Sequence, residues 1–137
     1  MSLSRSNFFP FSLLLSLCSS AAAAQPTGGE QLYNAQCGMC HKLTDEHRFG
    51  PSLKGVLGRQ AGSVPGFSFS ESYIEAGVAG LIWDAETLAE FLKEPKAFLA
   101  KYAAEPISNA MSPRYPDEGV RKAITEFLLT TNQGAGP

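Results

Sequence analysis

The sequence has few cysteines, no surplus of basic residues and no apolar run long enough to cross a membrane. Of its 137 residues, 3 are Cys, 11 are Lys or Arg and 13 are Asp or Glu, and the formal charge is −2. This balance excludes the basic surface with which proteins bind nucleic acids. With 44% apolar and 18% charged residues, the chain is neither disordered nor fibrous, and its length suits one domain. A two-lobed enzyme and a multi-span membrane protein are excluded as well.

The first two dozen residues have the pattern of a targeting segment. A positive residue, Arg5, precedes a short apolar stretch, and a run of alanines then closes at Ala24. The stretch is shorter than the ~20 residues that a membrane-spanning helix needs, which favours a cleaved signal peptide over an uncleaved anchor. We predict a signal peptide over residues 1–24, a single domain over residues 25–137 and a location in the periplasm of a bacterium.

Cleavage at that point would remove Cys18 and leave Cys37 and Cys40 as the only cysteines. Small exported domains normally depend on disulfides, but a bridge between residues three apart closes too small a loop to stabilise much. A chain of this size also buries only about two thirds of its unfolded surface. We therefore expect another component to fill and hold the core.

Apolar periodicity predicts short helices joined by long loops, with no pair of strands, so the predicted fold class is all-α. Glycines and prolines interrupt residues 42–65, and prolines bracket a loop over residues 105–116. The helices are expected over residues 28–40, from Ser70 to about Gly77, from Asp84 to the residue before Pro95, over residues 96–104, and from Asp117 onward.

The strongest chemical signal is the segment Cys37-Gly38-Met39-Cys40-His41. Two cysteines at i and i+3 can reach the two vinyl groups on one edge of a porphyrin, and the histidine that follows can bind its iron. This spacing predicts one covalent haem c per chain, attached through Cys37 and Cys40, with His41 as an iron ligand. There are three alternatives. A thioredoxin-like redox pair would need a βαβ unit, and a zinc site would need further ligands, of which only His47 is left outside the motif. The third alternative is a plain disulfide.

A second iron ligand is expected from the proline-bracketed loop. Met111 lies there, and a Met/His pair is typical of cytochromes c. Met39 lies inside the attachment motif and cannot reach the far side of the ring. Met111 could instead fill a gap in the core, in which case His47 or Lys101 would bind the iron, or its sixth position would stay open. We predict that His47, which lies among charged residues, is a solvated surface residue.

Beyond this motif, the sequence resembles the class I cytochromes c, especially their mitochondrial-type and photosynthetic-bacterial branch, over nearly all of residues 25–137. The resemblance implies a small cytochrome c fold, in which helices and long loops wrap around one haem. After the attachment motif, it is carried by Gly50-Pro51-Ser52-Leu53, Leu57-Gly58-Arg59, Pro65-Gly66-Phe67, Trp83, Glu86-Thr87-Leu88, Leu92, Pro95-Lys96 and the last helix.

The resemblance also implies roles for three further residues. In that family a proline like Pro51 holds the proximal histidine through a hydrogen bond to its carbonyl. An Arg like Arg59 and a Trp like Trp83 contact a buried haem propionate. Alternatively, Arg59 is an exposed cation and Trp83 is simply part of the core.

Two further features follow from the same resemblance. The stretch that leads to Met111 is longer than in the mitochondrial members, and Phe69 and Phe91 stand where those members usually carry tyrosines. In the family the first and last helices cross with a Gly and an aromatic residue packed against an aliphatic and an aromatic one. Here these would be Gly29 and Tyr33 against Ile124 and Phe127.

The predicted function is one-electron transfer rather than catalysis, because an iron with two protein ligands has no free position for a substrate. We predict a monomeric carrier between periplasmic or membrane redox partners, such as a dehydrogenase, a cytochrome complex or an oxidase. No nucleic-acid partner and no stable membrane insertion are expected. A second hypothesis is a dedicated haem subunit or private electron acceptor of one dehydrogenase or oxidase, favoured by the acidic balance. A third is a haem peroxidase or gas-binding protein with an open sixth position.

Overall fold

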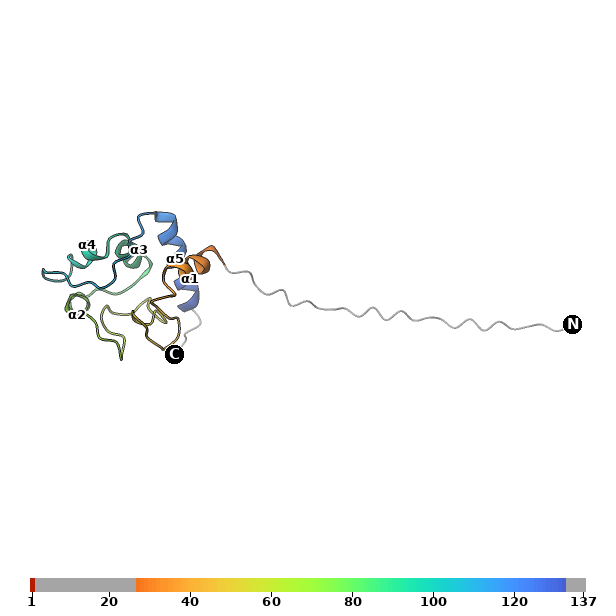
Figure 1. Cartoon of the computed structure of the whole chain (residues 1–137), viewed down its shortest axis with the longest axis horizontal. Coiled ribbons are helices and arrows are strands. Elements are labelled where there is room, and N and C mark those ends of the chain that lie inside the picture. The colour runs from red at the N-terminus through yellow and green to blue at the C-terminus, as the bar shows by residue number, and fades with distance from the viewer. Residues whose placement is uncertain (2–26, 133–137) are drawn as a thin grey trace.

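The computed structural model describes Met1 and residues 27–132, in which five helices are joined by irregular segments (Figure 1). The predicted all-α class is confirmed, and no helix of this part is long and apolar enough to cross a membrane. Apart from Met1, the predicted signal peptide with its Cys18 lies outside the described residues. The helices are α1 (Gly28–Gln36), α2 (Glu71–Val78), α3 (Ala85–Lys93), α4 (Pro95–Leu99) and α5 (Glu118–Asn132).

The sequence marks where α1, α3 and α4 begin. The Thr27 hydroxyl accepts a hydrogen bond from the third residue of α1, at 3.3 Å. At α3, the Asp84 carboxylate accepts from the backbone N–H of Thr87 at 2.7 Å, and the Thr87 hydroxyl accepts from the N–H of Asp84 at 2.8 Å. This reciprocal pair satisfies two N–H groups that a helix leaves without partners. Pro95 then ends α3 and opens α4, because proline is tolerated only in the first turn of a helix.

The first and last helices cross, as the resemblance implies, and the crossing depends on Gly29. A Cβ added there would overlap the carbonyl oxygen of Ala123 and lie 2.9 Å from the Cβ of Phe127. The Tyr33 ring packs on the Phe127 ring with centroids 5.5 Å apart, beside the buried Ile124. This close contact holds α1 against α5 (Figure 1), and Cys37, the residue after α1, is buried.

Two predicted helix ends are wrong. The first helix ends at Gln36 instead of residue 40, because the N–H groups of Cys40 and His41 both bond to the carbonyl of Cys37, at 3.0 and 2.9 Å. Residues 37–40 therefore form a tight turn after the helix. The fourth helix ends at Leu99 instead of residue 104, since the hydrogen bond of Tyr102 to Leu99 spans only three residues.

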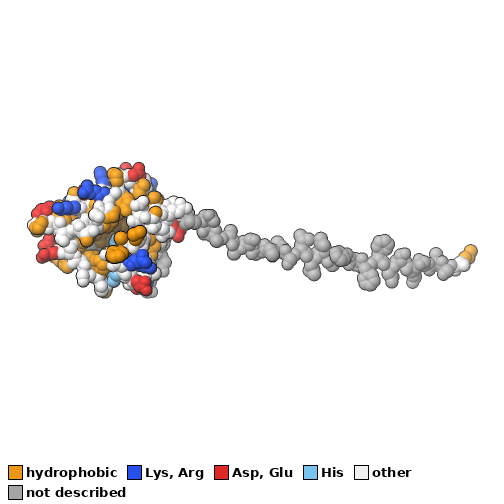
Figure 2. Space-filling model, viewed as in Figure 1, with side chains coloured by type: hydrophobic (Ala, Val, Ile, Leu, Met, Phe, Trp, Pro, Cys, Tyr) orange, Lys and Arg blue, Asp and Glu red, His pale blue; other side chains and the backbone are white. Residues whose placement is uncertain are grey.

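Besides the α1–α5 crossing, a chain of aromatic rings runs from half-buried positions into the buried core. Consecutive ring centroids lie 4.9 to 6.2 Å apart, within the range of favourable aromatic pairs. Figure 2 shows a hollow on one face of the described residues, bordered largely by hydrophobic side chains. The rings of the chain, in order of contact, are Phe67, Phe69, Tyr73, Phe91, Trp83 and Phe98.

Candidate haem-attachment site

The two cysteines lie on the turn that follows α1, and they differ in burial. Cys37 is buried, Cys40 is exposed, and both are free thiols. Burial, with a smaller effect of the nearby Cys40, raises the pKa of Cys37 to about 11. A thioredoxin-type pair needs a lowered thiol pKa, usually supplied by a helix N-terminus, whereas this pair follows a helix C-terminus. The site therefore lacks the features of a thiol redox centre.

His41 is held with one ring nitrogen bonded and the other available. Its Nδ1 lies 2.7 Å from the carbonyl oxygen of Pro51, which can only accept a hydrogen bond. Nδ1 therefore carries the hydrogen, and Nε2 keeps a lone pair. Burial lowers the pKa of His41, and the bond to Pro51 partly opposes this shift. A neutral imidazole oriented by a backbone carbonyl is the usual form of a metal-binding histidine.

Gly50 shapes the space beside this ring. A Cβ added to Gly50 would collide with the imidazole of His41, 2.6 Å from Nδ1 and 2.7 Å from Nε2. The Gly50 N–H also donates to the carbonyl of Cys40 at 2.9 Å, which ties the loop to the cysteine turn. Only glycine fits this close approach of backbone and ring. The sequence reasoning missed this role, although the signal was the glycine directly before Pro51.

His47 is not the solvated surface residue that its charged neighbours indicate, and that prediction is wrong. Its ring is half-buried and packs edge-on against Phe67, with centroids 5.5 Å apart. Nδ1 accepts from the N–H of Ser52 at 2.9 Å, so Nε2 carries the hydrogen and donates to the carbonyl of Pro65 at 2.8 Å. Both nitrogens are used within the fold, which leaves His47 no lone pair for a metal.

The loop that carries the predicted second ligand packs against the core. Met111 is half-buried against the core cluster, whereas Met39 is 73% exposed. The amide of Asn109 bonds to both backbone groups of Met111: Oδ1 accepts from its N–H at 3.0 Å, and Nδ2 donates to its carbonyl at 2.6 Å. Lys101 is engaged elsewhere, with Nζ 3.0 Å from a carboxylate oxygen of Glu90. Of the two side chains that could replace Met111 on the iron, His47 is thus occupied within the fold, and Lys101 makes an exposed ion pair.

Arg59 and Trp83 are neighbours across two backbone hydrogen bonds. The Trp83 N–H donates to the carbonyl of Arg59 at 2.9 Å, and the Trp83 carbonyl accepts from Gly58 at 2.6 Å. Trp83 is buried. Arg59 is half-buried, and burial lowers its pKa. Its guanidinium donates to the carbonyls of Ser52 and Lys54, at 2.9 and 3.2 Å. Arg59 is therefore not simply an exposed cation, and N–H groups remain on it for a carboxylate.

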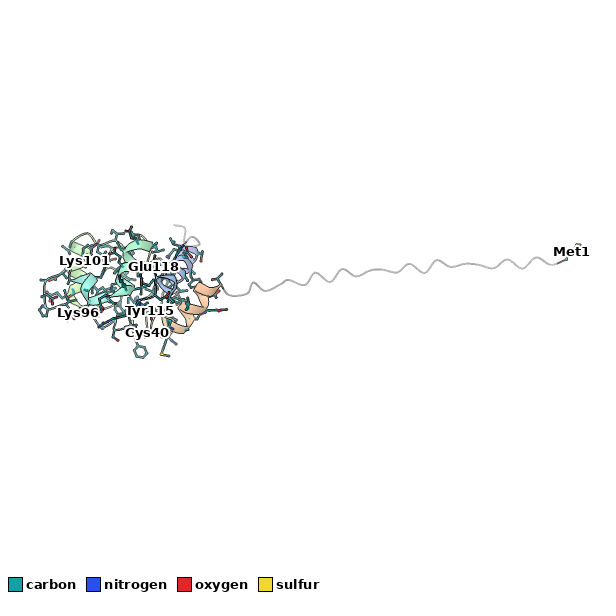
Figure 3. All side chains as sticks on the ribbon, turned by 90° about the horizontal axis from the view of Figure 1, so that it is seen from above. Met1, Cys40, Lys96, Lys101, Tyr115 and Glu118 are labelled. Carbon is teal, nitrogen blue, oxygen red and sulfur yellow. The ribbon has the colours of Figure 1, made fainter. Side chains whose placement is uncertain are left out.

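The donor set fits a haem better than a bare metal ion. In residues 27–132, no three side chains of His, Cys, Asp or Glu gather as they would around zinc. The groups present are two thiols, one imidazole with a free lone pair and one half-buried thioether. Figure 3 shows Cys40 close to Tyr115, whose hydroxyl donates to the carbonyl of Gln36 at 3.3 Å. Tyr115 thus joins the loop after Met111 to the cysteine end of α1.

Comparison with known proteins gives close relatives. No protein-family model matches the chain. Cytochrome c2 of Rhodopseudomonas palustris is 39% identical over 109 residues, which cover 74% of this chain and 94% of that protein. Cytochrome c2 iso-1 of Rhodospirillum centenum is 39% identical over 114 residues, which cover 77% of this chain and 94% of that protein. The solved structure of cytochrome c2 from Rhodospirillum centenum superposes with a TM-score of 0.71 at 35% identity, covering 76% of this chain and 95% of that one.

The contact between Gly50 and the His41 ring predicts a specific sensitivity. In Gly50→Ala, the new methyl group pushes the imidazole away from the Pro51 carbonyl, and we expect the free energy of unfolding of the haem-loaded protein to fall by about 2 kcal/mol. Denaturant titration followed by circular dichroism measures this. The matched control is Gly28→Ala, because a Cβ at Gly28 meets nothing within 4 Å. Equal stability of the two variants would contradict the prediction.

Proposed function

The chain belongs to the class I c-type cytochromes, and from that premise we propose that Cys37 and Cys40 hold its haem through thioether bonds while His41 and Met111 bind the iron. The chain is an electron carrier and not an enzyme, it carries covalently attached haem c, and it works with other redox proteins. The observation that supports the proposed ligands best is the 2.7 Å contact of His41 Nδ1 with the Pro51 carbonyl, because it leaves Nε2 for a metal.

Each proposed ligand suits reversible one-electron transfer. When bound, the haem supplies this chemistry by cycling its iron between Fe(II) and Fe(III). The Met111 thioether favours Fe(II) and so raises the reduction potential. His41, already fixed by its hydrogen bond, needs no reorientation when the charge changes. A buried tryptophan and several phenylalanines keep water from the site, which also favours the less charged form.

Arg59 and Trp83 are the proposed contacts of a haem propionate. The guanidinium of Arg59 is anchored by two backbone carbonyls and has N–H groups left to pair with a carboxylate. Trp83 is buried and tied to the same segment through its backbone. A cation placed there offsets the negative charge of a propionate that the fold would otherwise bury without a partner.

Partners are proposed to dock on an apolar surface around Cys40, formed by Met39 and Phe49. These side chains are 73% and 87% exposed, which is unusual for large apolar groups. The two chain neighbours of Phe49 bond to the turn that carries Met39: the guanidinium of Arg48 donates to the carbonyl of Met39 at 3.2 Å, and the N–H of Gly50 donates to the carbonyl of Cys40 at 2.9 Å. The chain has a net charge of −2 and lacks an excess of lysine to steer an acidic partner. We propose a short-lived apolar contact with a dehydrogenase, a cytochrome complex or an oxidase, made by a monomer.

We also propose that residues 1–24 are a signal peptide and that residues 25–137 are the working domain, in the periplasm of a bacterium. The alanine run that closes at Ala24 supports the cleavage point. Export is consistent with the use of both remaining cysteines for haem attachment. A dedicated haem subunit of one enzyme is the second candidate function, favoured by the acidic balance. A stable stoichiometric partner in gel filtration of a native extract would support that second function.

Replacing the proposed sulfur ligand tests the coordination. In Met111→Ala, we expect the far-red absorption band of a sulfur–iron bond to disappear. The midpoint potential should fall by about 0.2 V, a fraction of the roughly 0.8 V over which axial ligands set haem potentials. Met39→Ala is the matched control and should keep both properties. If Met111→Ala kept the band, the ligand would have to come from another residue.

The mass of the exported protein tests attachment and processing together. We expect the protein to begin at Gln25 and to carry one haem that survives denaturation, since thioether bonds are covalent. The double variant Cys37→Ser, Cys40→Ser should lose the haem. The control Cys18→Ser should have the same mass as the wild type, because residue 18 is removed with the leader. A haem-free mass for the wild type would refute covalent attachment.

The apolar surface formed by Met39 and Phe49 predicts how transfer responds to mutation and salt. In Phe49→Ala, oxidation of the reduced protein by membrane vesicles of the producing bacterium should slow by about tenfold, because part of the ~1.5–3 kcal/mol gained by burying a phenylalanine is lost. Raising the salt concentration should change the wild-type rate little. The control is Val78→Ala, a side chain of α2 that is 80% exposed. A steep salt dependence would instead indicate charge-guided docking.

A further inference from the structure

The loop that carries Met111 is joined to α2 by the hydroxyl of a half-buried tyrosine. The Tyr73 hydroxyl donates to Oδ1 of Asn109 at 2.6 Å, and Asn109 in turn bonds to both backbone groups of Met111. We propose that Tyr73 is a positioning residue that keeps the Met111 sulfur on the iron by fixing the amide of Asn109. This inference rests on the proposed role of Met111.

The hydrogen bonds fix how the Asn109 amide is turned. The Met111 carbonyl can only accept and the Met111 N–H can only donate, so Nδ2 must face the carbonyl and Oδ1 the N–H. The Tyr73 hydroxyl then meets Oδ1, which accepts two hydrogen bonds at once. A side-chain amide satisfies all three contacts. A carboxylate at position 109 would keep the two acceptor contacts and lose the donor.

Tyr73 is itself rigidly placed. Its ring packs against the rings of Phe69 and Phe91, each with centroids 6.1 Å away. Burial raises its pKa well above the ordinary tyrosine value, so the hydroxyl keeps its hydrogen at neutral pH. Both neighbours are phenylalanines, so among these three packed rings only Tyr73 can donate a hydrogen bond to the loop.

Three other side chains at the start of α2 and within it form hydrogen bonds with the same loop. The Ser70 hydroxyl donates to the carbonyl of Ser108 at 2.6 Å, and the buried Ser72 hydroxyl accepts from the N–H of Ser108 at 2.9 Å. The carboxylate of Glu75 accepts from the N–H of Ala104 at 3.0 Å. The loop has no helix of its own between residues 104 and 115. Side-chain hydrogen bonds from α2 therefore take the place of secondary structure in holding it.

Competition with free imidazole tests the inference, because imidazole binds the iron only when the methionine leaves. In haem-loaded Tyr73→Phe, we expect the apparent affinity for imidazole to rise about five- to tenfold. In a denaturant titration of the same variant, the far-red sulfur–iron band should be lost at a lower denaturant concentration than the helical signal. Asn109→Asp should raise the imidazole affinity more, roughly 30-fold, since a donor is lost and a charge faces the Met111 carbonyl. If Tyr73→Phe folds poorly, Asn109→Asp still tests the positioning of Met111, because it leaves the Tyr73 side chain unaltered.

Tyr102→Phe is the matched control, because this half-buried tyrosine packs on Phe98 and is not linked to Asn109. Its imidazole affinity should equal that of the wild type. If Tyr73→Phe and Asn109→Asp both match Tyr102→Phe in imidazole affinity and in the loss of the band, the positioning role is refuted while Met111 stays the ligand. If the wild type shows no sulfur–iron band, the ligand assignment fails and the inference falls with it.

Discussion

The hydrogen bond between His41 and the Pro51 carbonyl is the constraint on which the rest of the site depends. It fixes the tautomer, so that Nε2 alone is free, and it fixes the plane of the ring. The Tyr33 hydroxyl donates to the backbone carbonyl of the same histidine at 2.9 Å, and Gly50 leaves room beside the imidazole. Ring and backbone are both held by groups of the protein. With His41 as the proposed iron ligand, this arrangement lets the ring move little when the iron changes charge, which favours fast electron transfer.

The two sides of the site are held by different physical means. On the His41 side, the end of α1 is locked by the α1–α5 crossing, where Gly29 lets two backbones approach closely. On the Met111 side no regular element is present, and polar side chains of α2 hold the loop. Packing of helices resists displacement strongly, whereas single hydrogen bonds contribute about 1 kcal/mol each. The Met111 loop is therefore the less firmly held side of the proposed iron site.

The sequence predicts the parts of this molecule that are governed by local rules. The cysteine spacing with its histidine identifies the cofactor, Pro95 and the Asp84 cap mark the ends of α3, and apolar spacing finds α5. What it does not predict depends on contacts between distant segments. His47 lies among charged residues in the sequence but is bonded to Pro65 in the fold, and the link from Tyr73 to Asn109 spans 36 residues.

The charge and the exposed side chains of the carrier bear on how it recognises its partners. A shuttle that meets several partners in turn needs contacts that form and break quickly, and charge attraction over a distance is one way to achieve this. This chain has a net charge of −2, and Met39 and Phe49 stand exposed beside the attachment turn. Apolar contacts act only at short range, so they give little steering but hold the haem edge close once two proteins meet. The proposed apolar surface around Cys40 suits partners that are already abundant nearby. Recognition would then depend on the shape of this surface and less on a pattern of charges.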